Sequence, residues 1–157
     1  DMRLRCLEPN VITYNAAISA CEKGARWHEA SGMFSDMRPR RLSPDVLTYS
    51  AAVRACDRGA QWHEALGMFS EMRQRHLELN AVIYNSVLKV CERGAQWHEA
   101  LGMFSSMRQR RLDPDLITYN TAVTTFEKGA RWQEALCTLS DMRLHRVEPD
   151  VITYNAA

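Results

Sequence analysis

The string Val11-Ile12-Thr13-Tyr14-Asn15 decides the fold, because close copies of it return at intervals of 35 residues. The later copies are Val46-Leu47-Thr48-Tyr49-Ser50, Ala81-Val82-Ile83-Tyr84-Asn85, Leu116-Ile117-Thr118-Tyr119-Asn120 and Val151-Ile152-Thr153-Tyr154-Asn155. The same period carries Trp27, Trp62, Trp97 and Trp132. Internal repetition at this period predicts an array of stacked supersecondary units. We expect complete repeats at 11–45, 46–80, 81–115 and 116–150, the tail of a preceding repeat at 1–10, and the start of a further one at 151–157.

Within one repeat, the spacing of apolar residues predicts two helices. The first runs from Thr13 to Lys23, and its apolar residues recur at steps of three and four: Tyr14, Ala17, Ile18 and Cys21. The second runs from Arg26 to about Arg38 and carries a similar stripe of Trp27, Ala30, Phe34 and Met37. Gly24 is expected to end the first helix in the left-handed conformation, and Pro44 to stop the second.

No stretch of the chain shows the alternation of a strand, so the predicted fold class is all-α. A single helical hairpin cannot bury its own apolar stripe. We therefore expect an α-solenoid of stacked helical hairpins, with the Trp and Met stripes in its core. Because the ends of such arrays need polar caps, the partial repeats at 1–10 and 151–157 predict that the chain is a fragment of a longer array.

The composition is ordinary for a soluble protein. Of the 157 residues, 46% are hydrophobic and 25% are charged, and the formal net charge is +1. This balance excludes a strongly basic tail but not a locally basic groove. No run approaches the roughly 18 apolar residues of a transmembrane helix, and no apolar signal core follows the N-terminus. The chain has five cysteines: Cys6, Cys21, Cys56, Cys91 and Cys137. They form no CxxC pair, which favours reduced structural thiols in an intracellular or organellar compartment.

No motif in the chain points to catalysis. His28-Glu29 lacks the second histidine that a zinc-binding helix needs four residues later, because Gly32 stands there. We interpret His28 and its counterparts as exposed residues at a helix start. The counterpart of Cys21 in the fourth repeat is Phe126, so this position fills the core rather than supplying a reactive thiol. We predict no enzymatic activity, no catalytic residue, no cofactor and no metal site.

The first helix of each repeat has a second recurring face, opposite the apolar stripe. In the first repeat it consists of Ile12, Asn15, Ser19 and Glu22. Solvation explains the polar members in part, since an Asn near a helix start bonds free backbone N–H groups. The aliphatic residues beside them are harder to explain in this way, and they favour a binding surface: Ile12, Leu47, Val82 and Ile117.

Repeats of 35 residues with a TYN-like opening, an acidic-Ala step such as Glu29-Ala30, a late Met and a closing Pro-Asp resemble pentatricopeptide repeats. The likeness covers nearly the whole chain, and the tetratricopeptide signature is missing. The chain departs from the family pattern in its turns. Leu79 replaces a proline, and Gly-Ala replaces Ala-Gly between the two helices. Other residues stand where the family commonly has glycine: Arg41, His76, Arg111 and Arg146.

The resemblance implies a right-handed superhelix that binds single-stranded RNA in mitochondria or plastids, with one base per repeat. In the family, the fifth and last residues of a repeat select the base: here Asn15 with Asp45, Ser50 with Asn80, Asn85 with Asp115, and Asn120 with Asp150. An aliphatic second residue flanks the base: Ile12, Leu47, Val82 or Ile117. Basic residues of the first helix meet phosphates: Lys23, Arg54, Arg58, Lys89, Arg93 and Lys128. Asn with Asp implies uracil and Ser with Asn implies adenine, so the expected sequence is 5′-UAUU-3′.

This resemblance implies a role in organellar RNA processing, stability or translation. The alternative is a helical protein-interaction scaffold in a larger organellar assembly, because a fold alone does not fix function. The small net charge favours this alternative, since phosphate contacts supply much of the affinity for RNA. An RNA-editing or RNA-cleaving enzyme would need a catalytic domain beyond residue 157. None of these functions calls for insertion into a membrane.

Overall fold

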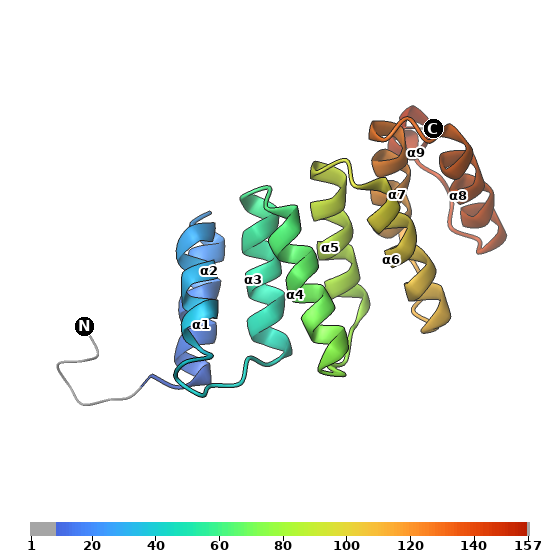
Figure 1. The fold of residues 1–157 in the computed structure, drawn as a ribbon. Helices are drawn as coiled ribbons and strands as arrows, with labels where there is room; N and C mark the ends of the chain where they lie inside the picture. Colours follow the sequence, from blue (N-terminus) through green and yellow to red (C-terminus); the bar gives the residue numbers. More distant parts are fainter. Residues whose placement is uncertain (1–8, 157) are drawn as a thin grey trace. The chain divides into compact units, whose positions relative to one another are not determined.

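The computed structural model describes residues 9–156, so most of the segment predicted as a repeat tail (1–10), together with Cys6 and Ala157, lies outside the described residues. The described residues form helices joined by turns and contain no strand, which confirms the all-α prediction. Figure 1 labels the helices along the chain: α1 (Val11–Lys23), α2 (Trp27–Asp36), α3 (Val46–Arg58), α4 (Trp62–Gln74), α5 (Ala81–Arg93), α6 (Trp97–Gln109), α7 (Leu116–Lys128), α8 (Trp132–Leu144) and α9 (Val151–Asn155).

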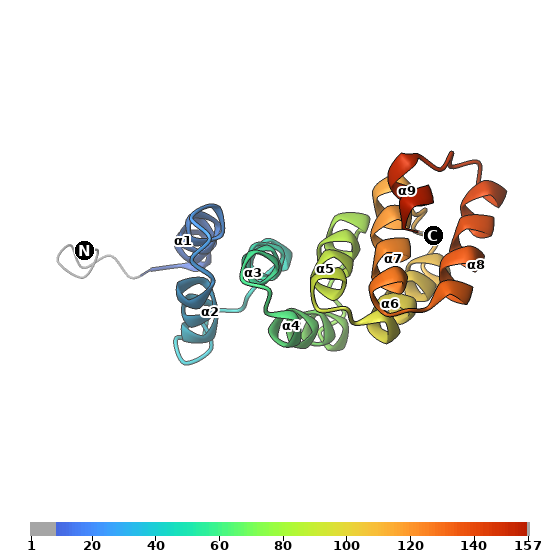
Figure 2. The same ribbon diagram turned by 90° about the horizontal axis from the view of Figure 1, so that it is seen from above.

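The chain divides into two compact bodies at the bond between Leu79 and Asn80. In the N-terminal body, α1 packs against α2 and α3, and α3 packs against α4. Figure 2 shows α1 next to α3, with α2 and α4 on the same side of them. In the C-terminal body, α5 packs against α6 and α7, and α7 packs against α8 and α9. Each body is therefore built from stacked helical hairpins, as the apolar spacing predicts.

Polar capping residues set where the first helix of each hairpin begins. Asp45, Asp115 and Asp150 each accept a hydrogen bond from the backbone N–H of the Thr three residues later, and the Thr hydroxyl accepts one from the Asp backbone N–H. Asn10 and Asn80 cap α1 and α5 through their side chains. The sequence predicts that the first helix begins at Thr13. The cap at Asn10 explains why α1 begins at Val11 instead. Several of these caps are also predicted base-selecting residues.

The core is a continuous set of side chains between the helices of each body. Met37, Met72, Met107 and Met142 are completely buried, so the predicted Met stripe is confirmed. In the C-terminal body, Phe126 packs among Phe104, Tyr119, Val123 and Met142. Cys56 and Cys91 are buried at the matching position of the second and third repeats, whereas Cys21 is half-buried. This position fills the core, as expected.

The tryptophans do not follow the prediction for the core. Trp27, Trp62 and Trp97 are only half-buried, and Trp132 is 64% exposed. The reason is their place at the first residue of the second helix, where the ring lies across a turn rather than between helices. A Cβ added to Gly59 would overlap the ring of Trp27, and one added to Gly129 would lie 2.6 Å from Cδ1 of Trp97. Gly59 and Gly129 therefore leave room for the tryptophan of the preceding repeat.

The left-handed residues of the turns are also placed differently from the prediction. Gly24 has a φ of −81°, and the residue after it, Ala25, has a φ of 54°. Other alanines and the residues after the second helices adopt positive φ as well: Ala60, Ala95, Ala130, Arg41, His76, Arg111 and Arg146. A left-handed non-glycine residue costs about 1–2 kcal/mol, which the packing of the hairpins must offset.

The Gly59→Ala substitution is expected to lower the free energy of unfolding by about 1–3 kcal/mol, because the new methyl group overlaps the Trp27 ring. Gly67→Ala provides the matched control. Gly67 lies inside α4 and a Cβ there meets nothing within 4 Å, so this change should stabilise the chain by roughly 0.5–1 kcal/mol. Thermal unfolding of both variants measures the difference. Equal midpoints would show that Trp27 does not require the space.

Candidate nucleic-acid interface

The first predicted base-selecting pair is in direct contact. Asn15 lies on α1, and Asp45 caps α3. The Asn15 Nδ2 donates to Oδ1 and Oδ2 of Asp45 at 3.2 and 3.3 Å. The hydroxyl of Thr48 lies 2.5 Å from the Asn15 Oδ1 and donates to it. The Asn15 amide is therefore held from both ends by groups of the next hairpin.

The same arrangement recurs twice in the C-terminal body. The Asn85 Nδ2 lies 3.5 Å from the Asp115 Oδ1, and the Thr118 hydroxyl lies 2.7 Å from both the Asn85 Oδ1 and the Asp115 Oδ1. The Asn120 Nδ2 donates to both carboxylate oxygens of Asp150 at 3.1 and 3.2 Å. The hydroxyl of Thr153 lies 2.5 Å from the Asn120 Oδ1. The spacing in sequence thus becomes a repeated Asn–Asp–Thr cluster.

The charge state of the aspartates fixes the direction of these hydrogen bonds. Burial raises the pKa of Asp45, but hydrogen bonds from Thr48 and Asn15 outweigh burial and hold it below its ordinary value. The pKa of Asp115 is lowered against burial in the same way. For Asp150, the backbone N–H of Thr153 is the main cause of its lowered pKa. The ionised carboxylates only accept, so each Asn turns its NH₂ toward Asp and its carbonyl toward Thr.

The remaining base-selecting pair lies on either side of the division between the two bodies. Ser50 is on α3 in the N-terminal body, and Asn80 caps α5 in the C-terminal body. Nη1 of Arg54 donates to the Ser50 Oγ at 3.0 Å. In this repeat junction, Ile83 takes the place that Thr48, Thr118 and Thr153 hold at the others. The orienting threonine is thus present where the fifth residue is Asn and is replaced where it is Ser.

The predicted base-flanking residues are exposed on the first helices. Ile12 is 76% exposed, Leu47 69%, Val82 59% and Ile117 61%. Each lies three residues before a predicted base-selecting residue, which is one helical turn and places both on the same face. In each repeat, an apolar surface in contact with solvent therefore adjoins a polar group.

The predicted phosphate-contacting residues differ in their surroundings. Lys23, Arg58, Lys89 and Arg93 are exposed. Arg54 pairs with Glu22 at 3.0 Å, and Lys128 pairs with Glu92 at 2.8 Å. A phosphate that reaches Arg54 or Lys128 must compete with the paired carboxylate. Their role remains a prediction.

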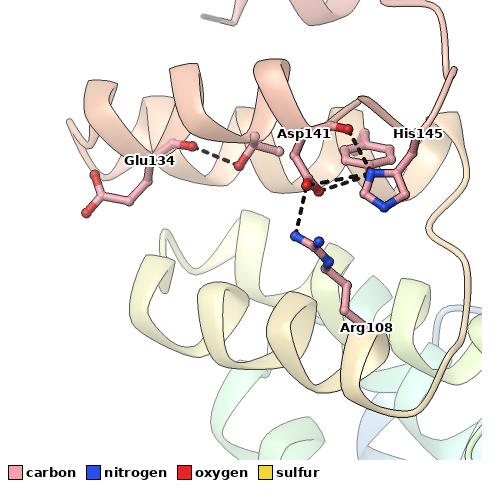
Figure 3. A network of polar contacts seen from close by, with 6 residues as sticks. Arg108, Glu134, Asp141 and His145 are labelled. Carbon is pink, nitrogen blue, oxygen red and sulfur yellow. Dashed lines mark hydrogen bonds and ion pairs between the residues drawn. The ribbon is translucent and has the colours of Figure 1, made fainter. Parts of the chain in front are cut away.

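A separate polar network joins the second helices. Figure 3 shows Arg108 of α6 pointing toward Asp141 of α8, with His145 beside it. Arg108 pairs with Asp141 at 2.8 Å, and the Tyr119 hydroxyl donates to the same carboxylate at 3.2 Å. Burial raises the pKa of Tyr119 to about 12, so the phenol keeps its proton. In the N-terminal body, Arg38 and Glu71 form the matching link at 2.6 Å. These arginines hold successive hairpins together.

The other candidate groups show no arrangement for catalysis. His28, His63 and His98 are exposed and stack on the preceding Trp rings, with centroids 3.2–3.4 Å apart. Burial raises the pKa of Cys56 and of Cys91 to about 12, which leaves both as unreactive thiols. Between residues 9 and 156, no group of three or more His, Cys, Asp or Glu side chains could hold a metal ion. No helix in this range is long and apolar enough to cross a membrane.

The sequence missed two contacts of the candidate interface. One is the contact between the repeated threonine and the Asn amide. The sequence does hold a signal for it, because Thr48, Thr118 and Thr153 each stand 33 residues after an Asn, whereas Ile83 stands 33 residues after Ser50. The other is the contact between Arg54 and Ser50, which lie four residues apart on one helix.

Comparisons with known proteins identify the family of the repeats. A family model described as the PPR repeat family matches residues 9–58 and 79–128, and a second, described as PPR repeat, matches residues 47–77. No curated protein matches the sequence.

Among solved structures, the pentatricopeptide repeat protein PPR10 in complex with an 18-nt psaJ RNA element matches with a TM-score of 0.79 and 26% identity, over 96% of this chain and 22% of that one. PPR10 from maize matches with a TM-score of 0.70 and 31% identity, over 99% of this chain and 22% of that one. The PPR domain of protein-only RNase P 1 from Arabidopsis thaliana, in complex with tRNA, matches with a TM-score of 0.80 and 16% identity, over 90% and 75% of the two chains. The chain thus spans about a fifth of the length of PPR10.

Proposed function

The chain belongs to the PPR repeat family, and from this premise we propose that it binds single-stranded RNA with one base per repeat and prefers 5′-UAUU-3′ across its four complete repeats. Asn15 with Asp45 selects the first base, Ser50 with Asn80 the second, Asn85 with Asp115 the third, and Asn120 with Asp150 the fourth. The RNA bound in this way is an organellar transcript, in a mitochondrion or a plastid, whose processing, stability or translation depends on the contact. The RNA-bound PPR10 structure supports the class of ligand.

The oriented Asn amide carries the proposal for uracil. One N–H donates to Asp and one carbonyl lone pair accepts from Thr, which leaves one donor and one acceptor for a base. Ring position 3 is an N–H in uracil and a bare acceptor nitrogen in cytosine, so each base suits only one orientation of the amide. An amide that cannot turn over can therefore distinguish the two pyrimidines.

The exposed aliphatic residues support base stacking. A base that enters between Ile12 and Leu47, or between Val82 and Ile117, would cover apolar surface that water now contacts. The exposed cations Lys23, Arg58, Lys89 and Arg93, with Arg54 and Lys128, then lie along the phosphates.

Fluorescence anisotropy with labelled RNA at two salt concentrations tests the proposal. An oligonucleotide that contains 5′-UAUU-3′ should bind more tightly than a scrambled one of the same composition. Both should bind more weakly at the higher salt concentration, because phosphate contacts release counterions. Equal affinity for the two RNAs would leave the protein-interaction scaffold as the function.

The Asp115→Asn substitution is expected to lower the preference of the third repeat for uracil over cytosine by about tenfold, the effect of one charge-assisted hydrogen bond. Asn can donate as well as accept, so it no longer fixes the Asn85 amide in one orientation. The helix cap should survive, because Asn80 caps α5 with the same side chain. The measurement compares the dissociation constants for 5′-UAUU-3′ and 5′-UACU-3′.

Asp113→Asn is the control for Asp115→Asn. Asp113 is exposed two residues earlier, so its replacement removes the same charge without touching the Asn85 amide. It should leave the ratio of the two dissociation constants unchanged. A ratio that falls equally in both variants would contradict the role of Asp115 and point to net charge alone.

A further inference from the structure

Arg54 joins the predicted base-selecting serine to a buried carboxylate. Its Nη1 donates to the Ser50 Oγ at 3.0 Å, and its Nη2 donates to the Glu22 Oε2 at 3.0 Å. The Glu22 side chain on α1 is only 12% exposed, whereas that of Arg54 on α3 is 40% exposed. The buried carboxylate thus anchors one side of the guanidinium, and the other side is aimed at the serine hydroxyl.

This linkage belongs to the second repeat alone among the four complete repeats. The residue four positions after the base-selecting one is Ser19, Lys89 or Thr124 in the other repeats. The carboxylate that matches Glu22 in the third repeat is Glu92, and it pairs instead with Lys128, four residues beyond Thr124. No other complete repeat has an arginine at this position, and no other has a serine as its fifth residue.

A guanidinium changes what a hydroxyl offers to a base. Arginine has N–H donors only, so the Ser50 oxygen must accept from it and has one lone pair fewer for another partner. The positive charge also polarises the O–H bond, which strengthens the hydroxyl as a donor and weakens it as an acceptor. A base atom with a lone pair is then attracted to Ser50, and a base N–H is repelled.

We propose that Arg54 is a positioning residue for base selection in the second repeat, where it makes Ser50 a hydrogen-bond donor and so favours adenine over guanine. Ring position 1 is a bare acceptor nitrogen in adenine and an N–H in guanine, so a donor hydroxyl at this ring position suits adenine and not guanine. This inference rests on the proposed RNA-binding function. It gives Arg54 a part in choosing the base, whereas a phosphate contact would affect all sequences alike.

The Arg54→Lys variant tests this role because it keeps the positive charge. A lysine has one nitrogen in place of the fork that spans Glu22 and Ser50, so the charge near the RNA remains while the bond to Ser50 is lost or shared. We expect the ratio of dissociation constants for 5′-UGUU-3′ and 5′-UAUU-3′ to fall about fivefold to tenfold. The salt dependence of binding should stay as in the unmodified chain.

Three further variants make the test specific. Arg58→Lys is the same exchange one turn later on α3, and it should leave the ratio unchanged. Glu22→Gln keeps Arg54 but removes its carboxylate anchor, and it should lower the ratio less than Arg54→Lys does. In a Ser50→Ala background, Arg54→Lys should no longer change the ratio, because the hydroxyl through which Arg54 acts is absent.

The outcomes separate this inference from the proposed function. If the unmodified chain prefers 5′-UAUU-3′ to a scrambled RNA but Arg54→Lys keeps the full preference for adenine, the role of Arg54 is overturned and the RNA-binding function stands. If Arg54→Lys weakens binding to both RNAs equally, Arg54 is a phosphate contact only. If the unmodified chain binds 5′-UAUU-3′ and scrambled RNA equally, the proposed function and this inference fall together.

Discussion

The Asn80→Asp substitution is expected to change the base preferred by the second repeat from adenine to guanine. A carboxylate accepts from both the N1–H and the NH₂ group of guanine, and it cannot donate to the acceptor nitrogen of adenine. A bidentate contact of this kind discriminates by about 1–3 kcal/mol, so the ratio of affinities should change by roughly fivefold to 150-fold.

The fold should tolerate this exchange. Asn80 caps α5 by accepting a hydrogen bond from the Ile83 backbone N–H at 3.1 Å, and Asp45, Asp115 and Asp150 cap their helices through the same atom. An aspartate is as good a cap as asparagine. The change in affinity is therefore expected without a change in the melting midpoint.

A panel of 5′-UAUU-3′, 5′-UGUU-3′ and scrambled RNA measures the effect. Asn10→Asp is the matched control, since Asn10 caps α1 in the same manner but belongs to no complete repeat. It should leave the choice of the second base unchanged. If Asn80→Asp binds the adenine and guanine RNAs as the unmodified chain does, position 80 does not select the base.

The Phe126→Ala substitution is expected to lower the free energy of unfolding by about 3–5 kcal/mol. Phe126 of α7 is completely buried in the core of the C-terminal body, which also contains Tyr119 of the same helix and Phe104 of α6. Alanine would leave a cavity that these rings cannot fill without moving. Because a domain of this size is stable by only about 5–15 kcal/mol, a change of this size removes a large part of the total.

Denaturant unfolding followed by circular dichroism measures this loss. Leu144→Ala serves as the control, because Leu144 is 77% exposed at the end of α8 and its replacement should change stability by no more than about 0.5 kcal/mol. A Phe126→Ala variant as stable as Leu144→Ala would mean that this core position is not packed as the structure has it.

The helices and their buried faces follow from the sequence because they depend on local periodicity. Steps of three and four place Tyr119 and Phe126 on one face whatever surrounds the helix, and both are buried. The caps are local as well, since Asp115 bonds the backbone three residues later. These parts of the fold need no knowledge of distant contacts.

The features that the sequence did not predict correctly share a physical origin, which is contact between repeats or across a turn. Trp27 is apolar and lies on a helical stripe, yet its ring lies over the turn at Gly59 and stays half-buried. The position of Gly24 suggested a left-handed turn residue, but its φ is −81° and Ala25 takes the positive φ. The bond from Thr48 to the Asn15 amide likewise joins residues 33 positions apart, and periodicity within one helix does not report it.

The contact between Trp27 and Gly59 bears on how such repeats can be recombined. Within each body, the earlier complete repeat supplies a tryptophan that lies against the glycine of the later one, and all four complete repeats carry both residues. Any of them can therefore follow any other without a new steric conflict at this point. The residues that we propose to select a base lie elsewhere on the repeat. Exchange of whole repeats would therefore change the proposed order of bases while the contact between tryptophan and glycine stays the same. Duplication and exchange of these repeats would thus change the RNA sequence that is bound while the fold stays the same.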